Sequence, residues 1–277
     1  MQLKELAVYL GIDPKTVQDI PVKGLQYDSR QVQPEDLFVA LSGSQNDGHL
    51  YIDSAVARGA AALLLERRDV LVPEGVPVLY CEDTRKAIAL LASLWAGFPD
   101  RGMRVIGVTG TNGKTTTTHL IKKLMDMEGR KTGLIGTIHN LAGEVELPSN
   151  HTTPEPIALT DLLLKMKNNG CQTVTMEVSS HALKQERVAG IHFDGAIFTN
   201  LTQDHLDFHH TFEDYRESKG RLFQALGRGM QKERYGIINI DDAAAAYFKS
   251  VCPVPVWTYG MERPATLQAV DSQVAQG

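Results

Sequence analysis

Apolar runs without polar alternation recur along the second half of the chain, and segments with helical spacing separate them. The runs are RVIGVTG, KTGLIGT, QTVTMEVS, DGAIFTN and YGIINI, and the helical segments are the one after Lys114, PIALTDLLLKMKNNG, TFEDYRESKGRLFQAL and DDAAAAYFKS. Unbroken apolar runs are typical of strands that are covered on both faces. The alternation of strand and helix therefore predicts an α/β fold with a mostly parallel sheet and helices on both of its faces.

A smaller α/β unit is predicted before it, from about residue 22 to residue 98. DLFVAL and VPVLYCE indicate strands, and YIDSAVARGAAALLLE indicates a helix that runs into a strand. In DTRKAIALLASLWAGF, Asp83 or Thr84 can cap a helix on which Ala87 and Leu91 share one face.

The segment FPDRGMR is the predicted boundary between the two units, because Pro99 and Gly102 disfavour continuation of the preceding helix. A chain of 277 residues exceeds a typical single domain, which fits two units that each bury a core. We therefore predict domains at residues 1–99 and 100–277. Ligands of the second domain should gather at the carboxyl ends of its strands.

Composition narrows the class of protein. Apolar residues make up 43% of the chain and charged residues 22%, as in ordinary globular proteins. The net charge of −5 gives no basic footprint for nucleic acid, and no apolar stretch approaches the roughly 20 residues of a membrane span. Cys81, Cys171 and Cys252 are odd in number and far apart, which indicates a reducing compartment. We expect a cytoplasmic protein without a nucleic-acid or membrane partner, and find no signal for an oligomeric state.

The segment GVTGTNGKTTTTHL lies between a predicted strand and a predicted helix and has the character of a phosphate-binding loop. The strict pattern G-x-x-x-x-G-K-[ST] fails by one place, because Val108 stands where its first glycine is required. The glycines of GTNGKTT still let backbone N–H groups converge on phosphate oxygens at a helix N-terminus. Lys114 can reach the terminal phosphates, and Thr115 can offer its hydroxyl to Mg²⁺. A glycine-rich turn that merely caps the helix is the alternative.

Two further predicted strands end in polar residues. Glu177 and Ser179 follow one of them, and Asn200 and His205 follow the next. Because the carboxyl ends of parallel strands share one edge, a carboxylate and an imidazole can meet the phosphates and a metal there. His205 and His209 are four residues apart, a spacing that suits zinc on a helix. Neither neighbour of His205 is the glutamate of a hydrolytic zinc site, so zinc is disfavoured.

Together these motifs resemble one family, the ATP-dependent Mur ligases of peptidoglycan synthesis, and within it the MurE type. The resemblance covers nearly the whole chain. It is carried by DSRQVQPEDLFVAL, GSQNDGH, GVTGTNGKTTTTHLI, TGLIGT, HTTPEP, MEVSSHALKQERVAGIHFDGAIFTNLTQDHLDFH and YRESKGRLF. The TGTNGKT loop is also similar to that of folylpolyglutamate synthase and cyanophycin synthetase, whereas HTTPEP followed by EVSSHAL and DHLDFH is typical of the MurE type.

The resemblance implies an ATP-dependent carbon–nitrogen ligase that uses two Mg²⁺ ions. Such an enzyme transfers the γ-phosphoryl group of ATP to the carboxylate of UDP-MurNAc-L-Ala-D-Glu and then joins the acyl group to the amine of a diamino acid. General likeness favours meso-diaminopimelate over L-lysine. The first domain would hold the UDP end of the substrate, and the second, a Rossmann-like P-loop domain, would bind ATP. A third, C-terminal ligase domain is expected to be absent from this chain, and the central domain to be incomplete.

Residue by residue, the resemblance implies three sets of contacts. The ATP contacts are Gly110, Thr111, Asn112, Gly113, Lys114, Thr115, Thr116 and Asn200. The Mg²⁺ ligands are Thr115, Glu177, His205 and Lys219, the lysine as a carbamate that replaces its positive charge with a negative one. The substrate contacts are Ser29, Ser44, Gln45, Asn46, His151, Thr152, Thr153, Ser179, Gln185 and Arg187. The catalytic set is Lys114, Glu177, His205 and Lys219.

Some positions leave alternatives open. Ser44 stands where many relatives have histidine, and His151 stands where many have asparagine, so Asn150 is an alternative contact. Without the resemblance, Lys219 is predicted to be an ordinary solvated helix lysine. A truncated ligase that binds its ligands without turnover is a second hypothesis. A P-loop ATPase or kinase unrelated to cell walls is a third, and it would leave Arg187 without a role.

Overall fold

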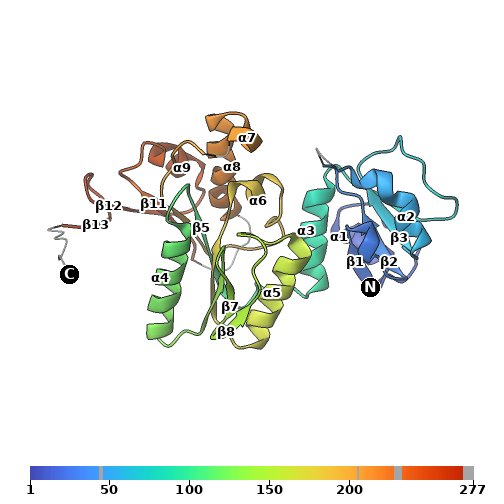
Figure 1. The fold of residues 1–277 in the computed structure, drawn as a ribbon, viewed down its shortest axis with the longest axis horizontal. Helices are drawn as coiled ribbons and strands as arrows, with labels where there is room; N and C mark the ends of the chain where they lie inside the picture. The colour runs from blue at the N-terminus through green and yellow to red at the C-terminus, as the bar shows by residue number, and fades with distance from the viewer. Residues whose placement is uncertain (44–45, 205, 228–232, 271–277) are drawn as a thin grey trace. The chain divides into compact units, whose positions relative to one another are not determined.

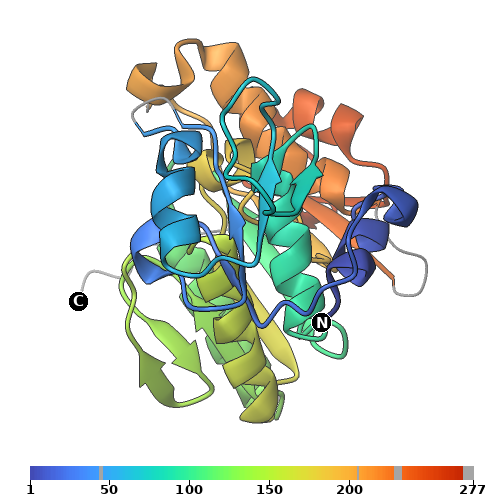
Figure 2. The same ribbon diagram turned by 90° about the vertical axis from the view of Figure 1, so that its right-hand side faces the viewer.

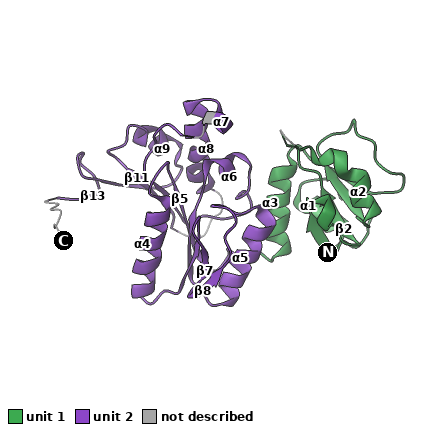
Figure 3. Cartoon of the chain, viewed as in Figure 1, with its two compact units in different colours: residues 1–97 green, residues 98–277 purple. Residues whose placement is uncertain are grey.

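A computed structural model describes residues 1–43, 46–204, 206–227 and 233–270. The chain divides into two compact units, residues 1–97 and residues 98–277 (Figure 3). Each unit contains its own sheet, and both sheets carry the strand and helix alternation that the hydrophobic pattern predicts. Among the described residues, no helix is both long enough and apolar enough to cross a membrane.

The first unit is built on a four-stranded parallel sheet in the order β1-β2-β3-β4. Its strands are β1 (Gly24–Gln26), β2 (Asp36–Val39), β3 (Ala62–Leu65) and β4 (Val78–Tyr80). Its helices are α1 (Leu3–Tyr9), α2 (Ile52–Ala57) and α3 (Thr84–Trp95), with 3₁₀ turns at Pro14–Thr16, Ser29–Gln31 and Gly48–Tyr51. Every residue of β2 and β3 is buried, which accounts for their unbroken apolar runs. Asp83 is the N-cap of α3, where its side chain accepts a hydrogen bond from the Lys86 N–H.

The second unit contains a nine-stranded sheet in the order β13-β12-β11-β10-β5-β9-β6-β7-β8 (Figure 1). The strands are β5 (Arg104–Thr109), β6 (Thr132–Ile135), β7 (Asn140–Ala142), β8 (Val145–Leu147), β9 (Thr173–Glu177), β10 (Gly195–Phe198), β11 (Tyr235–Asn239), β12 (Val256–Gly260) and β13 (Leu267–Gln268). Every pair from β13 to β6 is parallel, and only the β6–β7 and β7–β8 pairs are antiparallel. The prediction of a mostly parallel sheet is therefore confirmed.

Helices cover both faces of this sheet (Figures 1 and 2). They are α4 (Lys114–Met127), α5 (Pro156–Asn168), α6 (Ser180–Lys184), α7 (Leu206–His209), α8 (Phe212–Ala225) and α9 (Ala245–Val251). Successive residues of β5 point to opposite faces. Val105 packs in the core that includes Leu163 of α5 and Leu222 of α8, whereas Ile106 packs in the core that includes Ile121 of α4.

The hairpin of β7 and β8 is an element that the hydrophobic pattern did not predict. Its strands have three residues each, too few for a periodicity to show, and two of the three residues of β8 are exposed. Gly143 begins the turn with a φ of +65°, a conformation that glycine adopts without steric cost. The turn at Gly143, rather than the burial of apolar side chains on β8, therefore determines where this hairpin forms.

The neighbouring strands β10, β5, β9 and β6 are parallel and end at one edge of the sheet. Their last residues are Phe198, Thr109, Glu177 and Ile135. The loops that follow these strands come from four distant parts of the sequence but begin side by side. This edge holds the polar residues that the sequence analysis singled out.

Candidate functional site

Two glycines shape the loop between β5 and α4. A Cβ atom at Gly110, where φ is +150°, would lie 1.9 Å from the Thr199 Oγ1 atom after β10. Gly113 is the N-cap of α4 and has a φ of +85°, in the left-handed region that favours glycine. Both glycines of the GTNG segment are thus required, one for close approach and one for the turn into the helix.

Asn200 fixes the position of this loop. Its Oδ1 accepts a 3.0 Å hydrogen bond from the Asn112 N–H, and its Nδ2 donates to the Asn112 carbonyl at 3.0 Å. Its own carbonyl accepts a hydrogen bond from the Thr111 N–H at 2.8 Å. The structure therefore brings Asn200 to the loop as a partner of the loop backbone.

Two lysines donate hydrogen bonds to one carbonyl oxygen. Lys114 Nζ lies 2.9 Å from the Gly110 oxygen, and Lys219 Nζ, from α8, lies 2.8 Å from the same atom. Lys219 is 1% exposed, so it is not a solvated helix lysine. Burial lowers the pKa of both amines, and for Lys219 burial together with the charge of Lys114 lowers the pKa to about 7. Near neutral pH a substantial fraction of Lys219 is therefore the uncharged amine.

Glu177, the last residue of β9, is buried beside the first turn of α4. Its Oε2 accepts a hydrogen bond from Thr115 Oγ1 at 3.0 Å, and its Oε1 accepts one from the Thr137 N–H at 2.9 Å. The Thr137 hydroxyl donates to Oε2 at 3.2 Å. Sequence reasoning did not assign Thr137 a role, although its place at the end of the predicted strand KTGLIGT was a usable signal.

A cavity of about 260 Å³ lies at this edge of the sheet. Its lining residues are Thr111, Asn112, Gly113, Lys114, Thr115, Thr137, Thr152, Glu177, Ser179, Ser180 and Lys219. Nine of these eleven are residues that the sequence analysis named; the other two are Thr137 and Ser180. Thr116 lies nearby on α4 and is exposed.

Thr152 and Thr153 are adjacent in sequence but have different surroundings. The Thr152 hydroxyl lies 2.9 Å from the Thr137 hydroxyl at the cavity. Thr153 is 1% exposed; its hydroxyl donates to the Glu177 carbonyl at 2.9 Å and accepts from the Ser179 N–H at 3.0 Å. Thr153 therefore joins two strand-end loops from inside, whereas Thr152 faces the cavity. His151, one residue earlier, is exposed.

Arg187 is already paired within the protein. It lies 2.8 Å from a Glu155 carboxylate oxygen and donates to the Thr153 carbonyl at 3.0 Å. Gln185 Oε1 accepts two hydrogen bonds from the same guanidinium group. A substrate carboxylate that bound Arg187 would have to share it with Glu155.

Both ring nitrogens of His209 have partners within the protein. It is 1% exposed; its Nε2 lies 2.9 Å from Ser180 Oγ, and its Nδ1 lies 3.4 Å from Asp214 Oδ2. Burial lowers the pKa of this imidazole to about 4. Both ring nitrogens thus face protein groups. His205 lies outside the described residues, and among the residues that are described no group of three or more His, Cys, Asp and Glu could hold a metal ion.

The remaining expected contacts lie in the first unit. Ser29 begins a 3₁₀ turn and is 7% exposed, and Asn46 is exposed. Ser44 and Gln45 lie outside the described residues.

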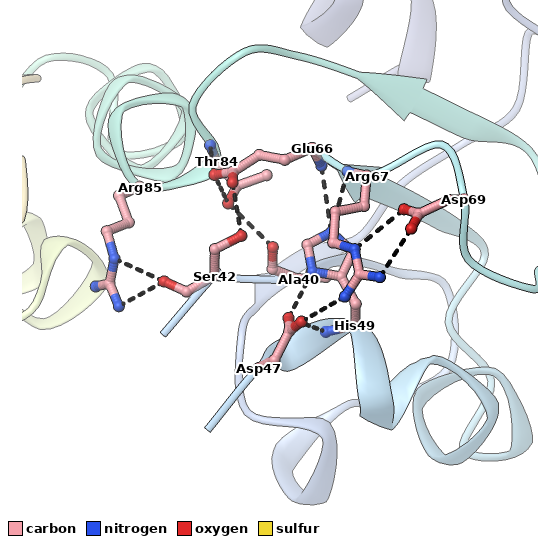
Figure 4. Close-up of polar contacts among 9 residues, drawn as sticks. All are labelled: Ala40, Ser42, Asp47, His49, Glu66, Arg67, Asp69, Thr84 and Arg85. Atoms are coloured by element: carbon pink, nitrogen blue, oxygen red, sulfur yellow. Dashed lines mark hydrogen bonds and ion pairs between the residues drawn. The ribbon is translucent and has the colours of Figure 1, made fainter. Parts of the chain in front are cut away.

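A polar network holds the residues that come before and after positions 44 and 45 in the sequence (Figure 4). Arg85 Nε and Nη2 donate to the Ser42 carbonyl at 3.1 and 3.0 Å. Glu66 accepts hydrogen bonds from the Ser42 and Thr84 hydroxyls, both at 2.6 Å. Burial alone would raise the pKa of Glu66, but these hydrogen bonds outweigh it and the pKa is lowered.

His49 holds Asp47, which follows positions 44 and 45 in the sequence. Its Nδ1 lies 2.7 Å from Asp47 Oδ1, and its Nε2 accepts hydrogen bonds from the N–H groups of Glu66 and Arg67 at 3.3 and 3.4 Å. Sequence reasoning did not assign His49, although it stands in the quoted GSQNDGH motif.

Comparisons with known proteins agree with the motifs. The family model "Mur ligase family, catalytic domain" matches residues 21–96, and the model "Mur ligase middle domain" matches residues 108–276. A UDP-N-acetylmuramoyl-L-alanyl-D-glutamate--2,6-diaminopimelate ligase of Syntrophomonas wolfei is 43% identical over 99% of this chain and 56% of its own length. The ligase of the same name from Geobacillus kaustophilus is 44% identical over 92% of this chain and 52% of its own length.

A solved structure of a UDP-N-acetylmuramoyl-L-alanyl-D-glutamate--2,6-diaminopimelate ligase has the same fold. It aligns with a TM-score of 0.76 and 28% identity over 95% of this chain and 53% of that chain. The chain thus spans about half the length of the curated relatives it matches. Since the middle-domain model covers more than half of the chain and these relatives exceed 40% identity, the chain belongs to the Mur ligase family.

Proposed function

We propose that this chain carries the UDP-substrate-binding and ATP-binding parts of a ligase of peptidoglycan synthesis. The ligase would add diaminopimelate to UDP-MurNAc-L-Ala-D-Glu, the two substrates that the names of the similar proteins give, and we expect the meso form of the diamino acid. The observation that carries the proposal is the meeting of Lys114, Lys219 and Glu177 at one cavity beside a helix N-terminus. We expect the protein in the cytoplasm, because the proposed reaction uses ATP and a nucleotide-linked precursor.

ATP would lie across residues 110–116, where main-chain N–H groups and the Lys114 ammonium face its phosphates. Thr115 and Glu177 supply hard oxygen ligands that are 3.0 Å apart, which fits Mg²⁺. A Mg²⁺ ion held there would neutralise β- and γ-phosphate oxygens. The γ-phosphoryl group passes to the substrate carboxylate, giving ADP and an acyl phosphate. The amine of the diamino acid then attacks the acyl carbon, phosphate leaves, and the nitrogen loses a proton.

Lys219 would act as a carbamate. Its lowered pKa leaves uncharged amine at neutral pH, and this is the form whose lone pair attacks CO₂. A nitrogen–carbon bond forms and one proton is lost to water, giving an anionic group that still has one N–H. That N–H can keep the hydrogen bond to the Gly110 carbonyl, while the new oxygens, together with His205, would hold a second Mg²⁺ ion.

The substrate would be held by two sets of residues. In the first domain, Ser29, Ser44, Gln45 and Asn46 would contact the UDP end. At the cavity, Thr152 and Ser179 would contact the peptide, with Thr153, Gln185 and Arg187 behind them. His151 and Asn150 are alternatives for one further contact.

Phosphate release tests the proposal. With ATP, Mg²⁺ and UDP-MurNAc-L-Ala-D-Glu present, we expect phosphate release that depends on meso-diaminopimelate and is much slower with L-lysine. ¹³C NMR after incubation with ¹³C-bicarbonate should show one carbamate signal that the Lys219→Ala variant lacks.

Because the chain spans half of its relatives' length, a binding unit without turnover is the second candidate. UDP-substrate and ATP binding without phosphate release would select it, and absence of UDP-substrate binding would contradict both.

A further inference from the structure

Two imidazoles face each other beside the nucleotide loop, and neither belongs to the site described above. His119 lies on α4, and His139 lies between β6 and β7. Their Nε2 atoms are 3.2 Å apart, with ring centroids 5.3 Å apart and ring planes at 50°. The His139 side chain is 28% exposed, so solutes can reach the pair from solvent.

The outer nitrogens of both rings face oxygen atoms. His119 Nδ1 lies 2.8 Å from the Thr115 carbonyl, and because a carbonyl can only accept, this nitrogen carries the hydrogen. In the neutral ring the lone pair is then on Nε2, directed toward His139. His139 Nδ1 lies 3.8 Å from a carboxylate oxygen of Glu146, an ion-pair distance that is too long for a hydrogen bond. With hydrogen on both outer nitrogens, the two Nε2 lone pairs face each other and can bind one cation; with hydrogen on His139 Nε2 instead, that nitrogen donates to His119 Nε2.

The surroundings of His119 match those of metal-bound histidines. Such histidines nearly always donate their second ring N–H to a carbonyl or a carboxylate. With zinc–nitrogen bonds of about 2.0–2.1 Å, two tetrahedral ligand nitrogens lie about 3.3 Å apart. The observed Nε2–Nε2 separation of 3.2 Å is close to that value.

We propose that His119 and His139 form a two-imidazole site for a borderline transition-metal ion such as Zn²⁺. Imidazole nitrogen suits Zn²⁺, Cu²⁺ and Ni²⁺, whereas Mg²⁺ prefers oxygen ligands. Among the described residues no third His, Cys, Asp or Glu completes a cluster, so water fills the other positions and binding is weaker than at a structural zinc site. The site does not depend on the proposed ligase activity.

Thr115 connects this site to the cavity. Its carbonyl is bonded to His119, and its hydroxyl is bonded to Glu177. A metal on the imidazole pair therefore acts on the first turn of α4. If the cavity binds ATP as proposed, metal and nucleotide must change each other's affinity by the same factor.

Zinc titration of the full chain by calorimetry, without nucleotide and with excess Mg²⁺ to fill oxygen-ligand sites, tests the site. We expect one Zn²⁺ per chain, and at least about tenfold weaker binding in each of His119→Gln and His139→Gln. His210→Asn is the matched control: it removes an exposed imidazole at a φ of +62°, which asparagine tolerates, and should bind zinc like the wild type.

Copper at one equivalent gives a second readout, since its EPR spectrum should show two coupled nitrogens in the wild type and fewer in either variant. Thermal unfolding of each variant checks that it is folded. Equal zinc affinity in the wild type and both variants would overturn the proposal. So would a wild type that takes up no zinc and whose ¹⁵N NMR spectrum shows a proton shared between the two Nε2 atoms.

Discussion

Two loops that each follow a parallel strand are held in opposite ways. After β2, side chains hold the chain: Arg85 and Glu66 bind Ser42, and His49 binds Asp47. After β5, the loop is held through its own backbone by Gly110 and the Asn200 amide. In the loop after β2, the charged groups are paired within the protein: the Glu66 and Asp47 carboxylates accept hydrogen bonds from neighbouring side chains.

The second arrangement brings two amines together. Lys114 and Lys219 both turn to the Gly110 carbonyl, and burial disfavours their charged forms. A protein that maximised stability would not place two amines there, so the difference between the loops supports our proposal that the second loop binds a polyanion.

The largest expected effect follows from replacing Lys219 with methionine. Turnover should fall at least about 100-fold, because methionine cannot form the carbamate that would hold the second Mg²⁺ ion, and the charge on the transferred phosphoryl group is then less stabilised. The free energy of unfolding of the unmodified protein at pH 7 should rise by about 1–2 kcal/mol, since the replaced group is a buried amine whose charged form burial disfavours, while Lys114 still donates to the Gly110 carbonyl. Lys123→Met, an exposed position on α4, is the control and should change neither quantity. A Lys219→Met protein with full turnover contradicts the role given to this amine.

Gly110→Ala should damage the second loop directly. The new Cβ would meet Thr199 Oγ1 at 1.9 Å in a backbone conformation that disfavours alanine, so we expect a loss of about 3 kcal/mol in unfolding free energy. Gly195→Ala, where the nearest atoms are 3.7 Å away, should cost less than about 1 kcal/mol. Urea denaturation measures both, and equal losses would show that the close approach to Thr199 is unimportant.

Glu66→Ala tests the first loop. It leaves the buried Thr84 hydroxyl with only the Ala40 carbonyl and removes the partner of Ser42, so about 2 kcal/mol of stability should be lost from the first unit. Hydrogen exchange of amides in residues 1–97 measures this loss. The exposed Glu74→Ala is the control. Affinity for the UDP substrate should fall, while ATP affinity should not; an equal effect on both ligands would contradict the separation of the two loops.

A further effect concerns pH. The pKa of His209 is lowered to about 4 in the folded protein, so between about pH 6.5 and pH 4 the unfolded chain binds the proton more readily. The free energy of unfolding should therefore decrease as pH falls through this range. Thermal unfolding from pH 7 to pH 4.5 should show a shallower decrease in His209→Gln than in the wild type. Identical slopes would mean that His209 is not kept neutral.

Much of the fold could be predicted from local pattern. The apolar runs that became β5, β9 and β10 are fully or almost fully buried, and Asp83 caps its helix as one of the two expected candidates. The β7–β8 hairpin was missed, because its three-residue strands carry no readable period. Nine of the eleven cavity-lining residues were named from motifs, whereas Thr137 and Ser180 were not.

The sequence alone determined the α/β class, the glycine loop before α4 and the identity of the polar strand ends, because these depend on periodicity and on residue types at short spacing. Only the tertiary structure decided that Lys219 lies against a loop more than 100 residues earlier, and that Arg187 is paired with Glu155. It also brought His119 and His139 together. These contacts join segments that are far apart in the sequence, and the packing of the helices and loops around the sheet brings them together. A local pattern of residues does not contain the distance between such segments.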